Sequence, residues 1–193
     1  MLCGMSMGAL NAIRYTARHP QRLSALVIVD VGPVVILEEH VAMEQFRNET
    51  ETLRDFDDFV QRAISFNPQR RPEHLLYSLL HSLKRVECGW TWKQHQRPRE
   101  ERETAESHWK AEREERARWM RADLSAITLP TLLMRGEKSK MFSPKAAQDA
   151  AALIEDCELA VIPRAGHSVQ GDNPQDCARV LDDFLTRRLG RSS

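Results

Sequence analysis

The run from Leu23 to Asp30 constrains the fold of this chain more than any other part of the sequence. Residues 25–29 are all apolar, three of them are β-branched, and Gly32-Pro33 follows directly. A short, nearly continuous run of this kind is typical of a strand that is buried on both faces of a parallel sheet. Such a sheet needs helices to cover it. The run therefore predicts an α/β layer fold.

Segments on either side of this run support the same fold class. Leu2-Cys3 is the end of an apolar run and predicts the end of a strand, and the helix-compatible stretch after it closes at His19-Pro20. Further buried strands are expected at Thr131–Met134 and Leu159–Ile162. Each is followed by a typical helix start, a capping residue with proline behind it: Ser143-Pro144 and Asn173-Pro174.

The middle of the chain has a different character. Amphipathic helices are predicted over Glu38–Ile64 and Glu73–Val86, and the aromatic passage Gly89–Trp92 follows. Between residues 97 and 121, 15 of 25 residues are charged with both signs interleaved, which favours a solvated helix over a binding tail. We therefore expect residues 1–37 and 123–193 to form an α/β core and residues 38–122 to form an inserted helical cap.

Composition and charge exclude several classes of protein. Hydrophobic residues make up 41% and charged residues 29%, so a disordered chain is excluded. Lys+Arg and Asp+Glu are both 28, which gives no positive field for nucleic acid, and no run of about 18 apolar residues predicts a membrane span. The four cysteines are scattered without zinc-type spacing. They indicate free thiols in a reducing, cytoplasmic compartment, and a homo-oligomer is left open.

The sequence Gly4-Met-Ser-Met-Gly8 matches the pattern G-x-S-x-G at a strand-to-helix junction. At such a sharp turn both glycines are expected to avoid side-chain clashes. Ser6 would then project above the sheet at a helix N-terminus, where developing negative charge is favoured. The pattern predicts that Ser6 is a nucleophile.

A serine hydroxyl is a weak nucleophile and needs a neighbouring base with an orienting acid. Of seven histidines, His167 alone is expected on a loop after a buried strand, at the same sheet edge as Ser6. Asp30 ends the apolar strand 24 residues beyond Ser6, where a carboxylate is costly without a partner. Its alternative role is to cap the loop at Gly32-Pro33. The residues thus predict a triad of Ser6, His167 and Asp30.

With these residues the chain resembles the α/β-hydrolase superfamily, in particular the small cofactor-free bacterial esterases and their C–C-bond-hydrolase and lactonase relatives. The resemblance covers nearly all 193 residues. It rests on the Gly4–Gly8 pattern, on Pro163-Arg-Ala-Gly-His-Ser168 followed by Gly171-Asp-Asn-Pro174, and more weakly on Gly89–Trp92. It implies no metal and no organic cofactor.

The sequence departs from the family in two places. In much of the superfamily the acid falls near Ser139, and a serine cannot hold an imidazolium. This strengthens Asp30, which matches a subgroup with its acid after the earlier strand, and leaves Glu137 as a poorer substitute. The other departure is at the front, where four strands and a loop that donates one oxyanion N–H would precede Ser6. We expect a fragment or a gene model begun at an internal Met, with a hydrophobic edge exposed along strand 23–30.

These observations predict a serine hydrolase that acts on a carboxylic ester or related small acyl substrate. Ser6 would attack, His167 would transfer the proton, Asp30 would hold the imidazole, and the Met7 N–H would bind the oxyanion. Two alternatives stay open. One is a C–C-bond hydrolase or enol-lactonase with the same triad, and the other is a truncated, non-catalytic remnant.

Overall fold

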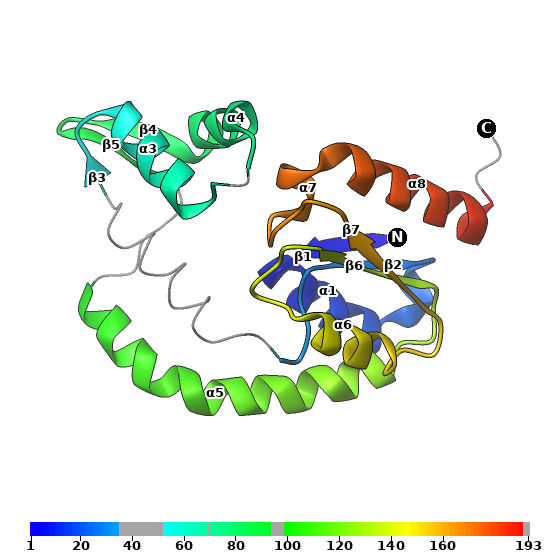
Figure 1. The fold of residues 1–193 in the computed structure, drawn as a ribbon. Helices are drawn as coiled ribbons and strands as arrows, with labels where there is room; N and C mark the ends of the chain where they lie inside the picture. Colours follow the sequence, from blue (N-terminus) through cyan, green and yellow to red (C-terminus); the bar gives the residue numbers. More distant parts are fainter. Residues whose placement is uncertain (35–51, 69, 94–98, 191–193) are drawn as a thin grey trace. The chain divides into compact units, whose positions relative to one another are not determined.

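The computed structural model describes residues 1–34, 52–68, 70–93 and 99–190. The chain divides into two compact units (Figure 1). Unit 1 comprises Met1–Ile36 with Glu112–Ser193, and unit 2 comprises Leu37–Ala111. No helix in the described ranges is long and apolar enough to cross a membrane.

The sheet of unit 1 has four parallel strands in the order β1-β2-β6-β7. They are β1 (Leu2–Met5), β2 (Leu26–Val29), β6 (Thr131–Gly136) and β7 (Cys157–Ile162). Their register aligns Leu26 with Leu2 on one side and with Thr131 on the other. The expectation of an exposed edge along residues 23–30 is therefore wrong, because four residues of β1 suffice to pair with all of β2 and β1 itself forms the edge.

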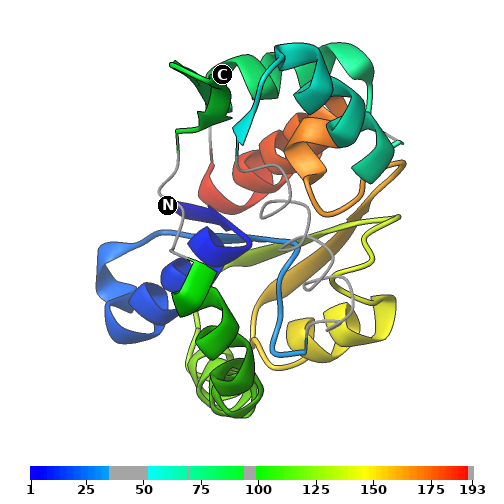
Figure 2. The ribbon, with the colours of Figure 1, turned by 90° about the vertical axis from the view of Figure 1, so that its left-hand side faces the viewer.

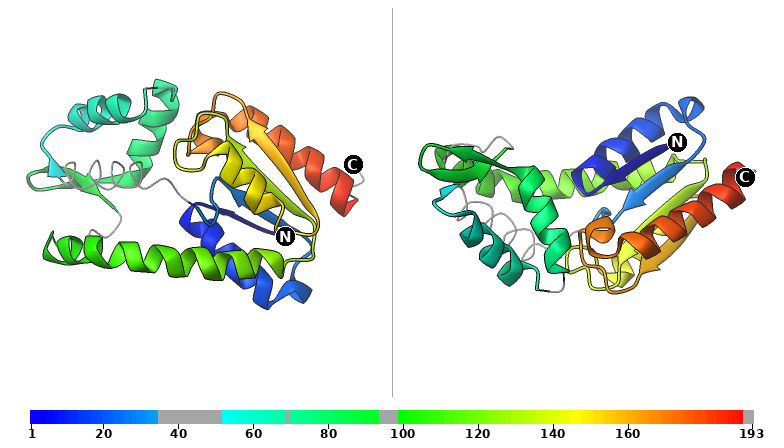
Figure 3. Two further views of the ribbon diagram at one scale, coloured as in Figure 1. Left: turned by 60° about the horizontal axis from the view of Figure 1, so that its bottom comes forward. Right: turned by 90° about the horizontal axis from the view of Figure 1, so that it is seen from above.

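Helices cover both faces of this sheet, as the α/β prediction requires. They are α1 (Met7–Arg18), α5 (Arg99–Ser125), α6 (Pro144–Ala151), α7 (Val169–Asp172) and α8 (Pro174–Leu189), with a 3₁₀ turn η1 at Pro20–Arg22. Figure 2 shows α1, α6 and the end of α5 on one side of the strands and α8 on the other. The right-hand view of Figure 3 shows α1 and α8 on opposite faces.

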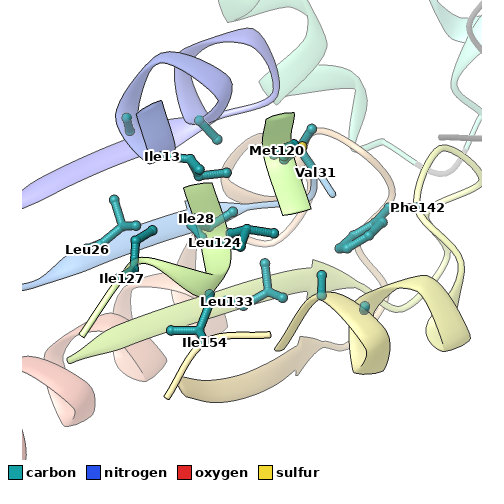
Figure 4. Close-up of a cluster of buried hydrophobic side chains, with 14 of the residues drawn as sticks. Ile13, Leu26, Ile28, Val31, Met120, Leu124, Ile127, Leu133, Phe142 and Ile154 are labelled. Atoms are coloured by element: carbon teal, nitrogen blue, oxygen red, sulfur yellow. The ribbon is translucent and has the colours of Figure 1, made fainter. Parts of the chain in front are cut away.

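Alternating residues of β2 explain its continuous apolar run. Leu26 and Ile28 pack with α1, α5 and α6 in one hydrophobic cluster, in which Met120 and Leu124 are the residues by which α5 docks (Figure 4). Val27 and Val29 pack with α8 in a second cluster on the opposite face. Every residue of the strand is therefore buried.

Both predicted helix starts after β6 and β7 are confirmed. The Ser143 hydroxyl accepts a hydrogen bond from the Ala146 N–H at the start of α6. The Asn173 side-chain oxygen accepts one from the Asp176 N–H at the start of α8. Each helix has proline as its first residue, where a missing N–H costs nothing.

Unit 2 contains α3 (Phe56–Phe66), α4 (Pro72–Ser82) and a small antiparallel sheet of order β3-β5-β4. Its strands are β3 (Thr52–Leu53), β4 (Leu83–Val86) and β5 (Gly89–Trp92). Around the buried Phe59, these elements contribute aliphatic and aromatic side chains to a separate hydrophobic cluster.

The prediction of an all-helical segment over Glu73–Val86 is wrong beyond Ser82. Leu83 is buried in the same cluster as Leu75 and Leu79, so the apolar spacing continues although the backbone changes to a strand. Gly89 supplies the left-handed φ of 139° that the turn into β5 uses. Up to residue 51, the predicted helix Glu38–Ile64 falls outside the described residues. Beyond that point the prediction is wrong for Thr52–Leu53, which form β3, and it agrees with α3 from Phe56 onwards. From Arg99 onwards the charged segment is helical, as α5.

Candidate active site

Ser6 lies on a sharp turn between β1 and α1. Its backbone has φ 49° and ψ −119°, and a non-glycine residue rarely adopts this left-handed conformation. The turn is held because the Ser6 N–H donates to the Val29 carbonyl at 3.1 Å, while the Ser6 carbonyl accepts the N–H groups of Ala9 and Leu10. The serine is therefore fixed between the end of a strand and the start of a helix.

The two glycines of the pattern have different reasons to be glycine. A Cβ on Gly4 would lie 2.5 Å from the Gly8 carbonyl oxygen and 2.7 Å from the Ala9 Cα, so the turn leaves no space there. A Cβ on Gly8 would meet no described atom within 4 Å. The steric explanation given for both glycines is wrong for Gly8, because its Cα faces outward on the exposed first turn of α1.

Asp30 follows β2 and is also in a left-handed conformation, with φ 52°. Its side chain is fully buried and receives three contacts. The Gly136 N–H donates to Oδ1 at 3.0 Å, the Ser139 hydroxyl donates to Oδ2 at 2.5 Å, and His167 Nδ1 lies 2.8 Å from Oδ2. The partners that a buried carboxylate requires are thus supplied by the end of β6, the loop after it and the loop after β7.

His167 joins the other two predicted residues. Its Nε2 atom lies 3.1 Å from Ser6 Oγ, while Nδ1 faces Asp30, and its side chain is 17% exposed. The structure therefore brings together Ser6, Asp30 and His167, which are separated by up to 161 residues in the chain. A hydroxyl, an imidazole and a carboxylate in this order can polarise the O–H bond of the serine.

The His167 loop is held by backbone and side-chain bonds on both sides. The buried Asp172 carboxylate accepts the Gly166 N–H at 2.8 Å, and Asn173 Nδ2 donates to the Pro163 carbonyl at 2.8 Å. A Cβ on Gly136 would lie 2.1 Å from the Gly166 carbonyl oxygen. Glycine at position 136 thus allows the end of β6 to touch the loop that carries His167.

Asp176 stabilises the same region electrostatically. It contacts Asn173 Nδ2 at 2.7 Å, Arg179 at 3.1 Å and Arg164 at 3.3 Å. The hydrogen bond from Asn173, followed by the bond from Arg179, lowers the pKa of the Asp176 carboxyl. The start of α8 therefore carries an ionised acid that holds Arg164 of the His167 loop.

The remaining predicted residues lie as follows. Met7 is the first residue of α1, and the first N–H groups of a helix have no acceptor within it. Glu137, the weaker candidate for the acid, instead accepts the Arg164 N–H through Oε2 at 2.7 Å. The four cysteines are free thiols, and burial raises the pKa of Cys157 to about 11.

Sequence reasoning missed the residues that hold Asp30. The sequence analysis considers Ser139 only as a residue that cannot serve as the acid, and it gives no role to Arg135 or Gly136. Arg135 is nevertheless buried at 4% exposure and donates to three carbonyls of the following loop. The available signal was an arginine and a glycine at the carboxyl end of an apolar parallel strand. In the described ranges, no group of three or more His, Cys, Asp or Glu side chains is placed to hold a metal ion.

Comparison with known proteins identifies the family of this fold. The family model for the alpha/beta hydrolase fold matches residues 1–174, nine-tenths of the chain. The chain belongs to the α/β-hydrolase family.

Two hydrolases are similar to this chain along almost its whole length. An esterase of Mycobacterium tuberculosis is 28% identical over 197 residues, which cover 96% of this chain and 60% of that protein. The 2-(acetamidomethylene)succinate hydrolase of Mesorhizobium japonicum is 26% identical over 190 residues, covering 96% of this chain and 63% of that one. The chain thus spans about three-fifths of the length of these relatives.

A solved α/β-hydrolase structure supports the same fold. The crystal structure of E-2-(acetamidomethylene)succinate hydrolase superposes with a TM-score of 0.75 at 22% identity, and the match covers 95% of this chain and 65% of that chain. At this level of identity the likeness concerns the fold. The two proteins therefore share a fold over the matched region.

Proposed function

We propose that this protein is a serine hydrolase that cleaves carboxylic esters or related acyl substrates. One observation carries the proposal: Ser6 Oγ, His167 and Asp30 form a continuous hydrogen-bonded series, with separations of 3.1 and 2.8 Å. Ser6 has a left-handed backbone at the sharp turn from β1 into α1, which is the conformation typical of a nucleophile between a strand and a helix. Membership in the α/β-hydrolase family and similarity to an esterase support the same reaction class.

The proposed reaction begins with attack of Ser6 Oγ on the acyl carbon. His167 Nε2 accepts the hydroxyl proton as the new C–O bond forms, and the Asp30 carboxylate stabilises the resulting imidazolium. The N–H of Met7, directly after the nucleophile at the start of α1, would donate to the tetrahedral oxyanion. Its position next to Ser6 supports that role.

The intermediate then collapses to an acyl-enzyme. The bond to the leaving oxygen breaks, and that oxygen takes the proton from His167 Nε2. Water next attacks the acyl carbon while His167 accepts one of its protons. The bond to Ser6 Oγ breaks, the serine recovers its proton, and the carboxylic acid leaves. Every proton in both half-reactions passes through one nitrogen of His167.

Covalent labelling tests the proposal directly. A small fluorophosphonate should add once to the chain by intact-mass spectrometry, and Ser6→Ala and His167→Ala should both lose the adduct. A soluble, folded chain that gives no adduct would contradict the proposal and favour the non-catalytic alternative. Circular dichroism of each variant separates loss of chemistry from loss of fold.

Substrate assays separate the two catalytic alternatives. Hydrolysis of short-chain nitrophenyl esters without turnover of vinylogous diketones or enol lactones supports the esterase. The reverse pattern supports a C–C-bond hydrolase or lactonase with the same three residues. One relative is named as a hydrolase of 2-(acetamidomethylene)succinate, so that compound belongs in the same panel.

A further inference from the structure

The loop after β6, residues 137–142, is organised around a buried guanidinium. Arg135 Nε donates to the Phe142 carbonyl at 2.6 Å, Nη1 to the Glu137 carbonyl at 3.1 Å and Nη2 to the Ser139 carbonyl at 3.0 Å. The planar fork of arginine fixes three acceptors in one geometry, which the single ammonium group of lysine does not reproduce. One side chain therefore fixes three carbonyls of this loop, which is also held by backbone hydrogen bonds from Glu137, Lys138 and Ser139.

The last residue of β6 and this loop together supply two of the three contacts to the Asp30 carboxylate. Gly136, next to Arg135, donates its N–H to Oδ1, and Ser139 donates its hydroxyl to Oδ2. Ser139 is itself only 6% exposed. Because the terminal torsion of an aspartate is soft, one donor on each oxygen is what holds the plane of the carboxylate.

The Ser139 hydroxyl and His167 contact the same atom, Oδ2 of Asp30. Oδ2 of Asp30 lies 2.5 Å from Ser139 Oγ and 2.8 Å from His167 Nδ1. Loss of the hydroxyl would free Oδ2 to turn and would leave a buried charged group with one donor fewer. Any such movement changes the angle at which the imidazole faces Ser6.

We infer that Arg135 and Ser139 form a positioning pair for the catalytic acid. Arg135 sets the path of the 137–142 loop, and this path places the Ser139 hydroxyl on Asp30, which in turn orients His167. The inference deepens the proposed function and rests on it. Neither residue contacts the reacting atoms, so both act through Asp30.

The first test compares Ser139→Ala with a control serine in the same part of the chain. Ser143 caps α6 by accepting the Ala146 N–H. We expect Ser139→Ala to lower the rate constant of fluorophosphonate addition to Ser6, and kcat for an ester, by about 10- to 100-fold with little change in KM. Ser139→Thr, which keeps the hydroxyl, should recover most of the rate, and Ser143→Ala should lower Tm without slowing the reaction.

The second test asks whether Arg135 acts through Ser139. Arg135→Lys should slow labelling about as much as Ser139→Ala, and the double variant should be no slower than the Ser139→Ala single variant. Multiplied effects in the double variant would overturn the coupling. An unchanged labelling rate in Ser139→Ala would overturn the inference. If Arg135→Lys does not fold, the labelling rate of Ser139→Ala alone tests the inference.

A separate measurement keeps this inference distinct from the proposed function. In the folded wild type, the far-downfield proton NMR signal of His167 Nδ1–H reports its bond to Asp30 independently of any reaction. We expect Ser139→Ala to shift or broaden this signal and Ser143→Ala to leave it unchanged. If the wild type shows the signal but forms no adduct, the proposed hydrolase function is refuted while the positioning role of Arg135 and Ser139 stands. If the signal is unchanged in Ser139→Ala, the positioning role is refuted.

Discussion

Three residues outside glycine adopt left-handed backbone conformations in the described ranges, and all three lie at strand ends around the candidate site. They are Ser6, Asp30 and Arg164, with φ of 49°, 52° and 59°. Such conformations cost about 1 to 3 kcal/mol each and persist where surrounding contacts hold them. At Ser6 and Asp30 the contacts are backbone hydrogen bonds to adjacent strands, such as that from the Asp30 N–H to the Met134 carbonyl at 2.8 Å, and the Arg164 N–H donates to the Glu137 carboxylate. Hydrogen bonds within the folded unit therefore hold the residues of the candidate site in conformations that they would otherwise rarely adopt.

The two glycines beside Ser6 provide a matched pair at this scale. Gly4→Ala forces a methyl group against the Gly8 carbonyl, so we expect fluorophosphonate labelling of Ser6 to fall by about 100-fold or more. Gly8→Ala enters open space at the start of α1 and should change the labelling rate less than about threefold. It should also raise stability slightly, since alanine favours helix by up to about 1 kcal/mol. Labelling rate constants from intact-mass spectrometry and Tm values check both variants. Equal effects of Gly4→Ala and Gly8→Ala on the labelling rate would contradict the conclusion that only Gly4 is sterically required.

Two helix starts share a capping pattern but differ in what the cap residue also contacts. Ser143 caps α6, whereas Asn173 caps α8 and in addition donates to the Pro163 carbonyl in the His167 loop. We expect Ser143→Ala and Asn173→Ala each to cost about 1 kcal/mol in urea unfolding. Asn173→Ala alone should also slow labelling of Ser6. A slowed Ser143→Ala variant would show that capping by itself controls the site.

The acid at the start of α8 makes stability depend on pH. The folded state lowers the pKa of Asp176, so its ionised form stabilises the fold above the unfolded carboxyl pKa of about 3.9. This contribution is lost as pH falls through the folded pKa. We therefore expect the wild type to lose more stability than Asp176→Asn when urea unfolding is followed from pH 6 down to pH 3. Parallel profiles would contradict the prediction.

At the scale of the whole molecule, the hydrogen bonds of the candidate site lie in unit 1, while unit 2 has its own hydrophobic cluster. Phe59 is fully buried in that cluster, where it packs against Trp92. Phe59→Ala should destabilise unit 2 by about 3 to 5 kcal/mol. Hydrogen exchange should then rise in α3 and β5 but not in β2 and β6, and Ser6 should still react with a small fluorophosphonate. Loss of protection in β2 would instead show that the two units unfold together.

Local patterns were sufficient for the strands of unit 1, for α1, α6 and α8, and for choosing the three residues that the structure brings together. Continuous apolar runs predict the strands, and Ser-Pro or Asn-Pro predicts the helix starts. The expectation that Leu159–Ile162 is buried is wrong, because β7 is an edge of the sheet and leaves Leu159 and Val161 exposed. The residue after each strand then falls at the same edge of a parallel sheet. Ser6, Asp30 and His167 could be chosen from this rule together with chemistry. The β4–β5 hairpin could not be predicted from local patterns, because Leu83 continues the apolar spacing of α4 into a strand.

The sequence by itself determined which side chains stand at the ends of which strands, since strand, turn and capping signals are carried by neighbouring residues. Only the tertiary structure decided what surrounds Asp30: Gly136 and Ser139 lie 106 and 109 residues further along the chain. Their hydrogen bonds depend on the pairing of β2 with β6 and on the loop path set by Arg135. The open space at Gly8 and the edge position of β1 were decided in the same way, because strand order and loop packing are properties of the folded chain as a whole.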